Sequence, residues 1–223
     1  MNAIILAAGM GTRLRPLTVD KPKCMVEVNG TPMVEQQIKF LREFGVNDIT
    51  LVSGYKAESL DFLREKYGVD IVFNDKFDVC NNIYSMYLVR DRLKDTFVLE
   101  GDVYMHKNCL SAKSHSTYFS KWNENYKREW GLKVDENNKL LDIVPGDGCG
   151  YIMSGISYWT AEDAAKIVKR MEAIIESEDY TDLFWDNVVL DIHQELDIYV
   201  QRVDDIYEID TVEELREVER VTR

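Results

Sequence analysis

The feature that most constrains this chain is its segment from residue 4 to residue 23, where a short apolar run meets a glycine-containing loop. The apolar run, residues 4–8, is typical of a buried central strand. Gly9 and Gly11 then interrupt it. Glycine tolerates positive φ and has no Cβ, so backbone N–H groups can turn toward a ligand and approach it closely. The segment therefore predicts a strand that ends in a ligand-binding loop.

Positive charge is concentrated beside this loop. Among residues 1–23 there are four basic residues and a single acid, Asp20, so the segment carries +3 while the whole chain of 223 residues carries −13. Local positive charge in an acidic protein favours an anion at that place. The negative balance of the rest argues against binding to nucleic acid or to an anionic membrane surface.

Two common phosphate-binding motifs do not fit the loop. The Rossmann fingerprint requires a third glycine where residue 14 is Leu, and the Gly-Lys-Ser/Thr of a Walker A loop occurs nowhere in the chain. What remains is a longer pattern, Leu-Ala-Ala-Gly-x-Gly-x-Arg-Leu-x-Pro-Leu-Thr, which Pro22-Lys23 closes. This pattern resembles the nucleotide-binding signature of the sugar-nucleotide pyrophosphorylase and cytidylyltransferase superfamily.

The signature suits a nucleoside triphosphate. Arg13 can neutralise charge on the β- and γ-phosphates, and Lys23 can place a point charge near the α-phosphate. Arg15 and Lys21 are expected to be solvated loop charges. The positions expected to contact the nucleotide lie at the strand end and in the loop, namely Leu6, Ala8, Gly9 and Gly11.

Strand and helix patterns alternate along the first half of the chain, which predicts right-handed βαβ crossovers. The expected fold is therefore α/β, a Rossmann-like three-layer nucleotidyltransferase fold with a mixed, mostly parallel sheet and a smaller antiparallel β region. Strands are expected at residues 4–8, 25–28, 49–53, 69–73, 97–100 and 198–203, helices from Pro32, through 60–67, from Thr160, near Thr181 and from Thr211, and the antiparallel region at 116–122, 132–134, 140–144 and 153–159.

Length and composition favour one domain over residues 1–223. Nothing in the chain approaches a membrane-spanning length, and the N-terminal apolar run lacks the features of a signal peptide. The four cysteines are widely spaced, without metal-ligand motifs, so they are expected to be free thiols in a reducing cytoplasm.

Two acids are candidates for a magnesium site. Asp102 follows the strand 97–100, at the sheet edge where open α/β folds bind ligands, and Asp186 lies on a later helix. Magnesium is commonly bound by one or two carboxylates together with substrate phosphates. The three histidines, at 106, 115 and 193, are expected to serve packing or the surface.

Several further runs resemble the bacterial choline-phosphate cytidylyltransferases. They are 54–55, 73–75, 81–88, 129–130, 154–155, 183–187 and 207–210. The resemblance implies CTP as the nucleotide, with Asn82, Ser85 and Gly101 near it, and Mg²⁺ on Asp102 and Asp186. It also implies that Glu129, Trp130 and Trp185 face the cationic head of a small aminoalkyl phosphate or phosphonate. A quaternary ammonium has no N–H to donate, so aromatic faces and a carboxylate are suitable partners.

Two positions depart from that resemblance. Gly131 follows Trp130 where a bulkier residue is expected, and Phe184 stands where a Tyr could sit. These departures make 2-aminoethylphosphonate an alternative acceptor to phosphocholine, because a related branch of the family activates it with CTP. A sugar-1-phosphate nucleotidyltransferase and a non-catalytic nucleotide-binding module are weaker alternatives. The oligomeric state, and whether the chain is a whole protein or one domain of a fusion, stay open.

Overall fold

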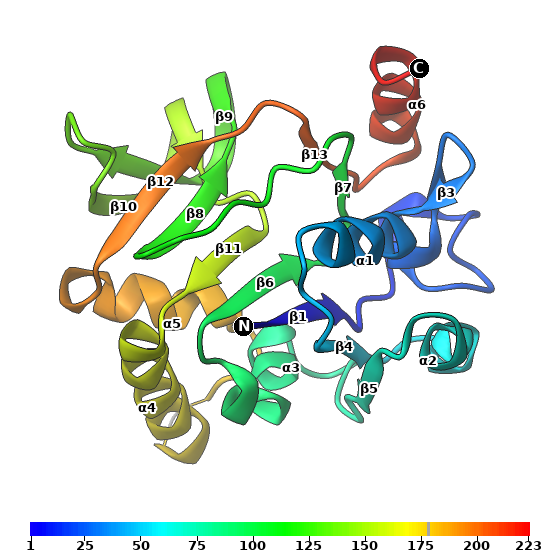
Figure 1. Cartoon of the computed structure of the whole chain (residues 1–223), viewed down its shortest axis with the longest axis horizontal. Helices are drawn as coiled ribbons and strands as arrows, with labels where there is room; N and C mark the ends of the chain where they lie inside the picture. The colour runs from blue at the N-terminus through cyan, green and yellow to red at the C-terminus, as the bar shows by residue number, and fades with distance from the viewer. Residues whose placement is uncertain (178) are drawn as a thin grey trace.

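The computed structural model describes residues 1–177 and 179–223, and a seven-stranded sheet forms its centre (Figure 1). The strand order is β12-β8-β11-β6-β1-β4-β5, and β11 runs antiparallel to its neighbours β6 and β8 while the other pairs are parallel. These strands are β1 (Asn2–Ala7), β4 (Ile49–Ser53), β5 (Asp70–Phe73), β6 (Thr96–Glu100), β8 (Ser116–Ser120), β11 (Ile156–Trp159) and β12 (Ile198–Arg202). The predicted mixed, mostly parallel sheet is confirmed.

Helices cover both faces of the sheet and make three layers. On one face lie α1 (Met33–Glu43) and α2 (Phe62–Tyr67), and on the other lie α3 (Asn82–Leu88), α4 (Ala161–Ser177) and α5 (Trp185–Ile192). The strands of the middle are apolar because both their faces are covered; Ile4 and Ile5, which point to opposite faces of β1, are both 0% exposed. A third, smaller core packs under the last helix, α6 (Val212–Val221).

Three short sheets flank the main one. They pair β2 (Glu27–Val28) with β3 (Thr31–Pro32), β7 (Val103–Met105) with β13 (Ile206–Glu208), and β9 (Trp122–Val134) with β10 (Leu140–Ile152), all antiparallel. Single 3-10 turns lie at Thr12–Leu14, Lys23–Met25, Ala57–Leu60, Arg90–Arg92 and His193–Glu195. A smaller antiparallel β region is therefore present, and it contains the predicted segments 132–134 and 140–144. The segments 116–122 and 153–159, which were predicted to belong to it, instead supply β8 and β11 of the main sheet.

Some predicted elements differ from the structure in extent. The strand predicted from residue 25 begins only at Glu27, because a 3-10 turn occupies Lys23–Met25. The helix predicted near Thr181 begins at Trp185. The preceding residues form a turn, closed by the hydrogen bond from Leu183 N to Tyr180 O (3.0 Å), and Asn81 N, just before α3, donates to Thr181 O (2.8 Å). The hairpin β9–β10 is longer than predicted. Its outer half was missed because it is largely exposed and its sequence lacks an apolar alternation.

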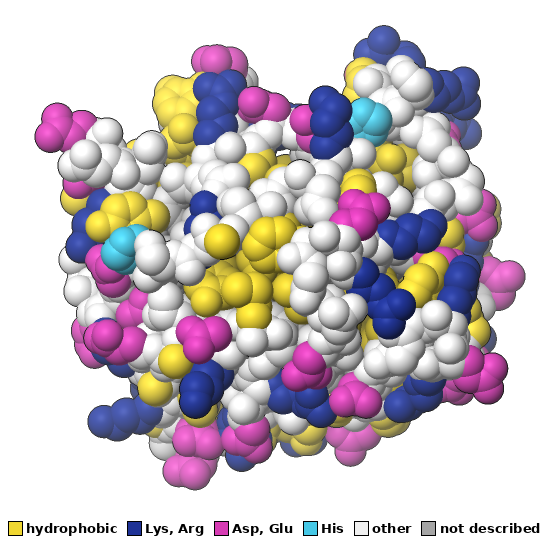
Figure 2. Space-filling view, viewed as in Figure 1, with side chains coloured by type: hydrophobic (Ala, Val, Ile, Leu, Met, Phe, Trp, Pro, Cys, Tyr) yellow, Lys and Arg dark blue, Asp and Glu magenta, His cyan; other side chains and the backbone are white. Residues whose placement is uncertain are grey.

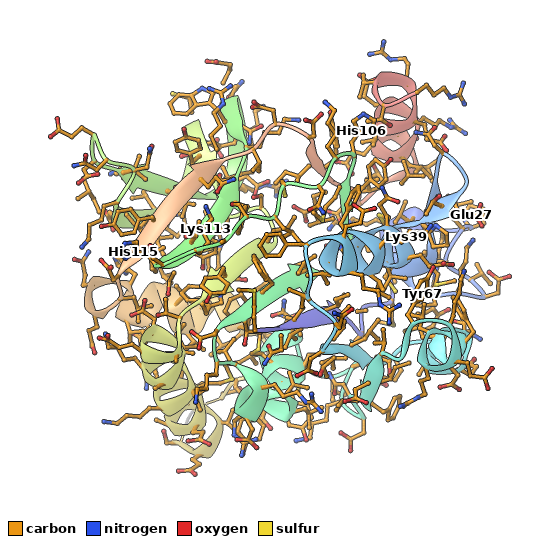
Figure 3. The ribbon with its side chains drawn as sticks, in the orientation of Figure 1. Glu27, Lys39, Tyr67, His106, Lys113 and His115 are labelled. Atoms are coloured by element: carbon orange, nitrogen blue, oxygen red, sulfur yellow. The ribbon has the colours of Figure 1, made fainter. Side chains whose placement is uncertain are left out.

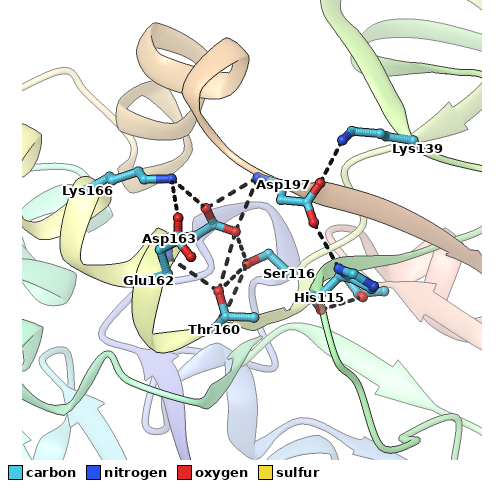
Figure 4. Close-up of polar contacts among 9 residues, drawn as sticks. His115, Ser116, Lys139, Thr160, Glu162, Asp163, Lys166 and Asp197 are labelled. Atoms are coloured by element: carbon cyan, nitrogen blue, oxygen red, sulfur yellow. Dashed lines mark hydrogen bonds and ion pairs between the residues drawn. The ribbon is translucent and has the colours of Figure 1, made fainter.

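A polar network, buried at Asp163 and Ser116 and partly exposed at its other members, joins α4 to the edge of the sheet (Figure 4). Asp163, 2% exposed, accepts hydrogen bonds from Ser116 Oγ (2.6 Å) and from the backbone N–H of Asp197 (3.3 Å). Asp197 in turn pairs with Lys139 (2.7 Å) and His115 (2.8 Å). These residues lie where β8 and β12 begin, at the edge of the sheet opposite the carboxyl ends of the parallel strands, so the network stabilises the fold away from the ligand edge.

Charged and apolar side chains occupy different parts of the surface. On the face shown in Figure 2, acidic and basic side chains are interspersed around the margin and apolar side chains gather near the centre. His106 and His115 lie on opposite sides of the molecule in Figure 3, and neither is among the described residues that line the two pockets discussed below. Within the described part of the chain, no helix combines the length and the apolar character needed to cross a membrane.

Candidate active site

The glycine loop leaves the carboxyl end of β1 and is shaped by close backbone packing. Gly11 has φ of 59°, and a Cβ at this position would lie 2.8 Å from the Cβ of Lys23. Only glycine meets both demands without strain. The Thr18 hydroxyl donates to Gly11 O (2.7 Å). The loop is thus folded back against the stem of Lys23, which brings the lysine to the end of β1.

Lys23 is the centre of an ion-pair network. Its ammonium lies 2.6 Å from Asp102 Oδ2 and also contacts Asp210 Oδ1, which Arg13 Nη2 approaches to 2.8 Å. Burial alone would lower the pKa of Lys23, but the carboxylates of Asp102 and Asp210 outweigh it and raise the pKa above its ordinary value. The lysine is therefore charged, although only 12% of its side chain is exposed.

Three carboxylates lie together beside this lysine. One oxygen each from Asp102, Glu208 and Asp210 falls within 4.8 Å of the others. Pairing of β7 with β13 brings them together, and Ile209 N donates to Asp102 O (3.1 Å). Burial first, and then the negative charges of Asp102 and Asp210, raise the pKa of Glu208 to about 8. A donor set of three carboxylate oxygens with mutual repulsion suits a hard cation such as Mg²⁺.

A cavity of about 300 Å³, here called the loop pocket, opens in front of the glycine loop. Most of the nucleotide-contacting residues predicted from the sequence line it, namely Leu6, Ala8, Gly9, Lys23, Asn82, Ser85 and Gly101. Ser85 is held there because its hydroxyl accepts a hydrogen bond from Asn74 Nδ2 (2.9 Å). The predicted residues Gly11 and Arg13 are not among the residues that line the loop pocket.

A second cavity of about 270 Å³, here called the tryptophan pocket, lies on the other side of Asp102. It contains the predicted head-group residues Glu129, Trp130 and Trp185, together with Asp102 and Asp186. Trp130 and Glu129 come from β9, whereas Trp185 and Asp186 come from α5. The two pockets share Asn82, Glu100, Asp102 and Phe184, so molecules bound in both would touch near Asp102.

The two tryptophans are not equivalent. Trp185 is 2% exposed, packs edge-on against Trp159 with ring centroids 5.8 Å apart, and donates from Nε1 to Glu100 Oε1 (3.0 Å). Trp130 is only partly buried at the wall of the pocket. Trp130 therefore offers more of its aromatic face to a ligand than Trp185, which mainly forms the pocket floor.

Glu100 connects the two pockets and was not identified from the sequence. Its Oε1 accepts hydrogen bonds from Asn82 Nδ2 (3.0 Å) and Trp185 Nε1 (3.0 Å), and Asn82 Oδ1 accepts the backbone N–H of Trp185 (2.8 Å). Burial, followed by the negative charges of Asp102 and Asp186, raises the pKa of Glu100 well above its ordinary range. The carboxyl group ties a residue of the loop pocket to a residue of the tryptophan pocket.

The two predicted magnesium ligands occupy different surroundings. Asp102 belongs to the group of three acids, and Asp186 is not part of that group among the described residues. Asp186 lies in the tryptophan pocket, where Tyr118 Oη is 3.4 Å from its Oδ1 and burial raises its pKa to about 7. Its role as a second ligand stays a prediction.

Sequence reasoning also missed Glu208 and Asp210 as part of the site. A signal was present, because the two acids flank Ile209, which is 0% exposed, and residues two apart on an extended chain point the same way. Only the pairing of β13 with β7 shows that this side faces Asp102.

Gly131 has a physical reason in the hairpin. A Cβ at Gly131 would lie 2.1 Å from Tyr126 Oη, and one at Gly148 would lie 2.7 Å from the same oxygen. The ring of Tyr126 therefore fills the space that a larger residue 131 would need.

Comparisons with known proteins place the chain. The family model described as nucleotidyl transferase matches residues 2–120. The choline-phosphate cytidylyltransferase of Streptococcus pneumoniae is 46% identical, aligned over 100% of this chain and 99% of its own length. The solved structure of that organism's CTP:phosphocholine cytidylyltransferase has a TM-score of 0.97 and covers 100% of this chain. The 2-aminoethylphosphonate cytidylyltransferase of Lancefieldella rimae is 37% identical, covering 96% of this chain and 90% of that protein.

Proposed function

This chain belongs to the nucleotidyl transferase family, and from that membership we propose that it transfers CMP from CTP to phosphocholine and releases pyrophosphate. The observation that carries the proposal is the meeting of two pockets at Asp102. One has a glycine loop and a buried, charged lysine, and the other has aromatic faces and carboxylates. A transfer between two bound molecules needs this kind of shared boundary.

The loop pocket suits the triphosphate. Loop amides would cradle the phosphates, Arg13 would neutralise charge on the β- and γ-phosphates, and Lys23 would stand near the α-phosphate. Lys23 and Arg13 now hold Asp210. Phosphate oxygens would take over these cationic partners, so nucleotide binding would exchange one set of charge pairs for another.

The reaction needs no general base. A phosphate oxygen of the acceptor is largely ionised at neutral pH and attacks the α-phosphorus, and the bond from that phosphorus to the oxygen that bridges to the β-phosphorus breaks. The electron pair leaves with pyrophosphate. Catalysis by this chain's residues is then positioning and charge neutralisation by Arg13 and Lys23.

Magnesium fits the acids at the junction. Asp102 would hold it, with Glu208 and Asp210 as the neighbouring donors, and Asp186 is a proposed further ligand from the helix side. When bound, the ion would neutralise charge on the phosphate oxygens. The repulsion that raises the pKa of Glu208 is a physical reason for these acids to take up a cation.

The tryptophan pocket suits the trimethylammonium head. Trp130 supplies an aromatic face and Glu129 a carboxylate whose pKa is raised by burial and by the charge of Asp210. 2-Aminoethylphosphonate is a second candidate, because Trp185 turns toward Trp159 and leaves fewer aromatic faces than the sequence suggests. A primary ammonium would rely on the carboxylates instead.

The test is pyrophosphate release from CTP, UTP, GTP, ATP or dTTP with phosphocholine, 2-aminoethylphosphonate or a sugar 1-phosphate. We expect the highest kcat/KM with CTP and phosphocholine. A tenfold or greater preference for 2-aminoethylphosphonate would overturn the acceptor but not the reaction class. Pyrophosphate release that occurs only with a sugar 1-phosphate would overturn the proposal. The absence of release with every acceptor tested would overturn it as well. One domain over residues 1–223 and residence in the cytoplasm stay predictions.

A further inference from the structure

We propose that Gln37 of α1 is a positioning residue for Asp102, because its side-chain amide holds the turn that carries this carboxylate. The inference rests on the proposed function for its meaning in catalysis. Gln37 lies outside both pockets and is 0% exposed, on the face of α1 that packs against the sheet. It acts through the backbone and touches no substrate.

The contacts of the amide bracket the turn between β6 and β7. Gln37 Nε2 donates to Glu100 O (2.8 Å) and to Val103 O (2.8 Å), the last residue of β6 and the first of β7. Gly101 and Asp102 are the two residues between these acceptors. Both protons of one amide nitrogen therefore span the turn and fix the separation of its ends.

The other half of the amide shows what the residue contributes. Gln37 Oε1 is buried and accepts no hydrogen bond from any described residue. Burying an acceptor without a partner destabilises the fold, and a methionine of similar length would avoid that cost. A flipped amide would set Oε1 against two carbonyl oxygens, so its orientation is determined. What Gln37 supplies and a methionine would not is therefore the pair of N–H donors to the turn.

The remaining restraints on the turn come from the backbone. Gly101 N donates to Leu6 O (2.8 Å), and Ile209 N donates to Asp102 O (3.1 Å). A Cβ at residue 101 would lie 2.9 Å from Leu6 O, so the turn sits tightly against β1. Gln37 adds the restraint from the helix layer. Without it, the Asp102 carboxylate would shift relative to Lys23, to Glu208 of β13 and to Asp210 shortly after that strand.

The experiment compares Gln37→Met with Ile38→Ala in the full chain. Ile38 is the next residue of α1, is also 0% exposed and packs in the core, but its side chain has no hydrogen-bond donor for the carbonyls of the turn, so its truncation tests the loss of packing without the loss of those bonds. The measurements are kcat, KM for both substrates, equilibrium binding of Mn²⁺ alone by electron paramagnetic resonance, hydrogen exchange of residues 100–105 and the unfolding midpoint.

We expect Gln37→Met to lower kcat about tenfold or more, to weaken Mn²⁺ binding about fivefold and to speed exchange in the turn. Ile38→Ala should leave kcat and Mn²⁺ binding within about twofold of the parent, even at an equal or larger loss of midpoint. Gln37→Glu keeps the shape but sets a carboxylate against the two carbonyls, and kcat should fall as well. It takes the place of the Met variant if that one does not fold.

The inference is overturned if either folded Gln37 variant keeps kcat and Mn²⁺ binding within about twofold of the parent, or if its losses match those of Ile38→Ala at equal midpoint. Failure of the proposed function is a separate outcome. It would appear as a wild type inactive with CTP and phosphocholine, and Mn²⁺ binding and hydrogen exchange would still decide the role of Gln37.

Discussion

The loop pocket and the tryptophan pocket share a boundary but come from different parts of the chain. Of the residues that line the loop pocket, only Phe184 follows residue 102, whereas 11 of the 16 that line the tryptophan pocket follow residue 103. The family model covers residues 2–120, which include all of the loop pocket except Phe184. The loop pocket thus lies almost wholly within the segment that the family model matches, whereas most of the tryptophan pocket lies outside it.

The difference lies also in how each pocket is built. The loop pocket is built around the glycine loop after β1, whose shape depends on close backbone packing, and residues of three further segments before residue 103 complete it together with Phe184. The tryptophan pocket depends on side chains that β9, α5 and β13 bring together from separate positions. Side chains can change one at a time without disturbing the sheet, so the acceptor can vary while the nucleotide chemistry is kept.

The largest expected effect is on the loop side. Lys23→Met should lower kcat/KM by about 10³-fold, because a preorganised charge near the reacting phosphate is lost. Arg13→Ala is expected to lower turnover by a similar order. Lys21→Met, in the same loop, is the control and should stay within about twofold of the parent. Steady-state pyrophosphate release is measured for all three variants. Near-normal turnover of Lys23→Met would contradict the assignment of Lys23 to the phosphates.

The next effect concerns the boundary itself. Asp102→Asn and Asp210→Asn should each lower kcat by about 10² to 10³-fold and weaken Mn²⁺ binding, since a neutral amide is a poorer ligand for a hard cation. The variant Asp186→Asn tests whether Asp186 is a ligand of the metal. Loss of Mn²⁺ binding equal to that of Asp102→Asn would confirm Asp186 as a ligand. Unchanged binding would restrict the site to Asp102, Glu208 and Asp210.

A smaller effect should be confined to the acceptor side. Trp130→Ala is expected to raise KM for phosphocholine by about 10- to 100-fold, from a lost cation–π contact of about 1–2 kcal/mol and lost packing, with KM for CTP unchanged. Trp122→Ala, in the same strand but 39% exposed and against Tyr151, is the control. If 2-aminoethylphosphonate is the better acceptor, Glu129→Gln should harm its KM more than Trp130→Phe does.

The smallest effect is on stability. Burial raises the pKa of Asp186 from 3.8 to about 7, so the folded state holds a proton that the unfolded state has lost between these values. Stability should therefore fall as pH rises from about 4 to about 7, by on the order of 2 kcal/mol since Asp186 keeps some exposure to solvent, and level off above pH 7. Asp186→Asn should remove this part of the slope. Unfolding midpoints of both proteins across that pH range, with chelator present, give the comparison, and parallel curves would contradict it.

Much of the fold was predictable because its signals are local. The strand Ile49–Ser53 was predicted without error. The helix predicted from Thr211 is present and begins with a capping box, in which Glu214 N donates to Thr211 Oγ1 (3.2 Å) and Thr211 N donates to Glu214 Oε2 (2.9 Å). In both cases neighbouring residues carry the whole signal. The glycine loop, a continuous motif, was recognisable for the same reason.

The parts that were missed depend on tertiary pairing. The short strands β7 and β13 have too few residues to show a period, and their pairing alone brings Glu208 and Asp210 to Asp102. Helix α3 was not predicted, since Asn82 and Ser85 weaken its propensity and its first turn is held by contacts with α5. The role of Glu100 depends on where Asn82 and Trp185 lie in space.

The late position of β13 has a consequence for the order in which the protein is made. On the ribosome the glycine loop and most of the loop pocket emerge first, whereas a domain generally folds as a unit. Glu208 and Asp210, which complete the acid group, follow more than one hundred residues after Asp102. The group of three acids is therefore complete only after nearly the whole chain has been made. On the proposed function, a cation held by all three would be available only to a chain that has folded to its C-terminal part.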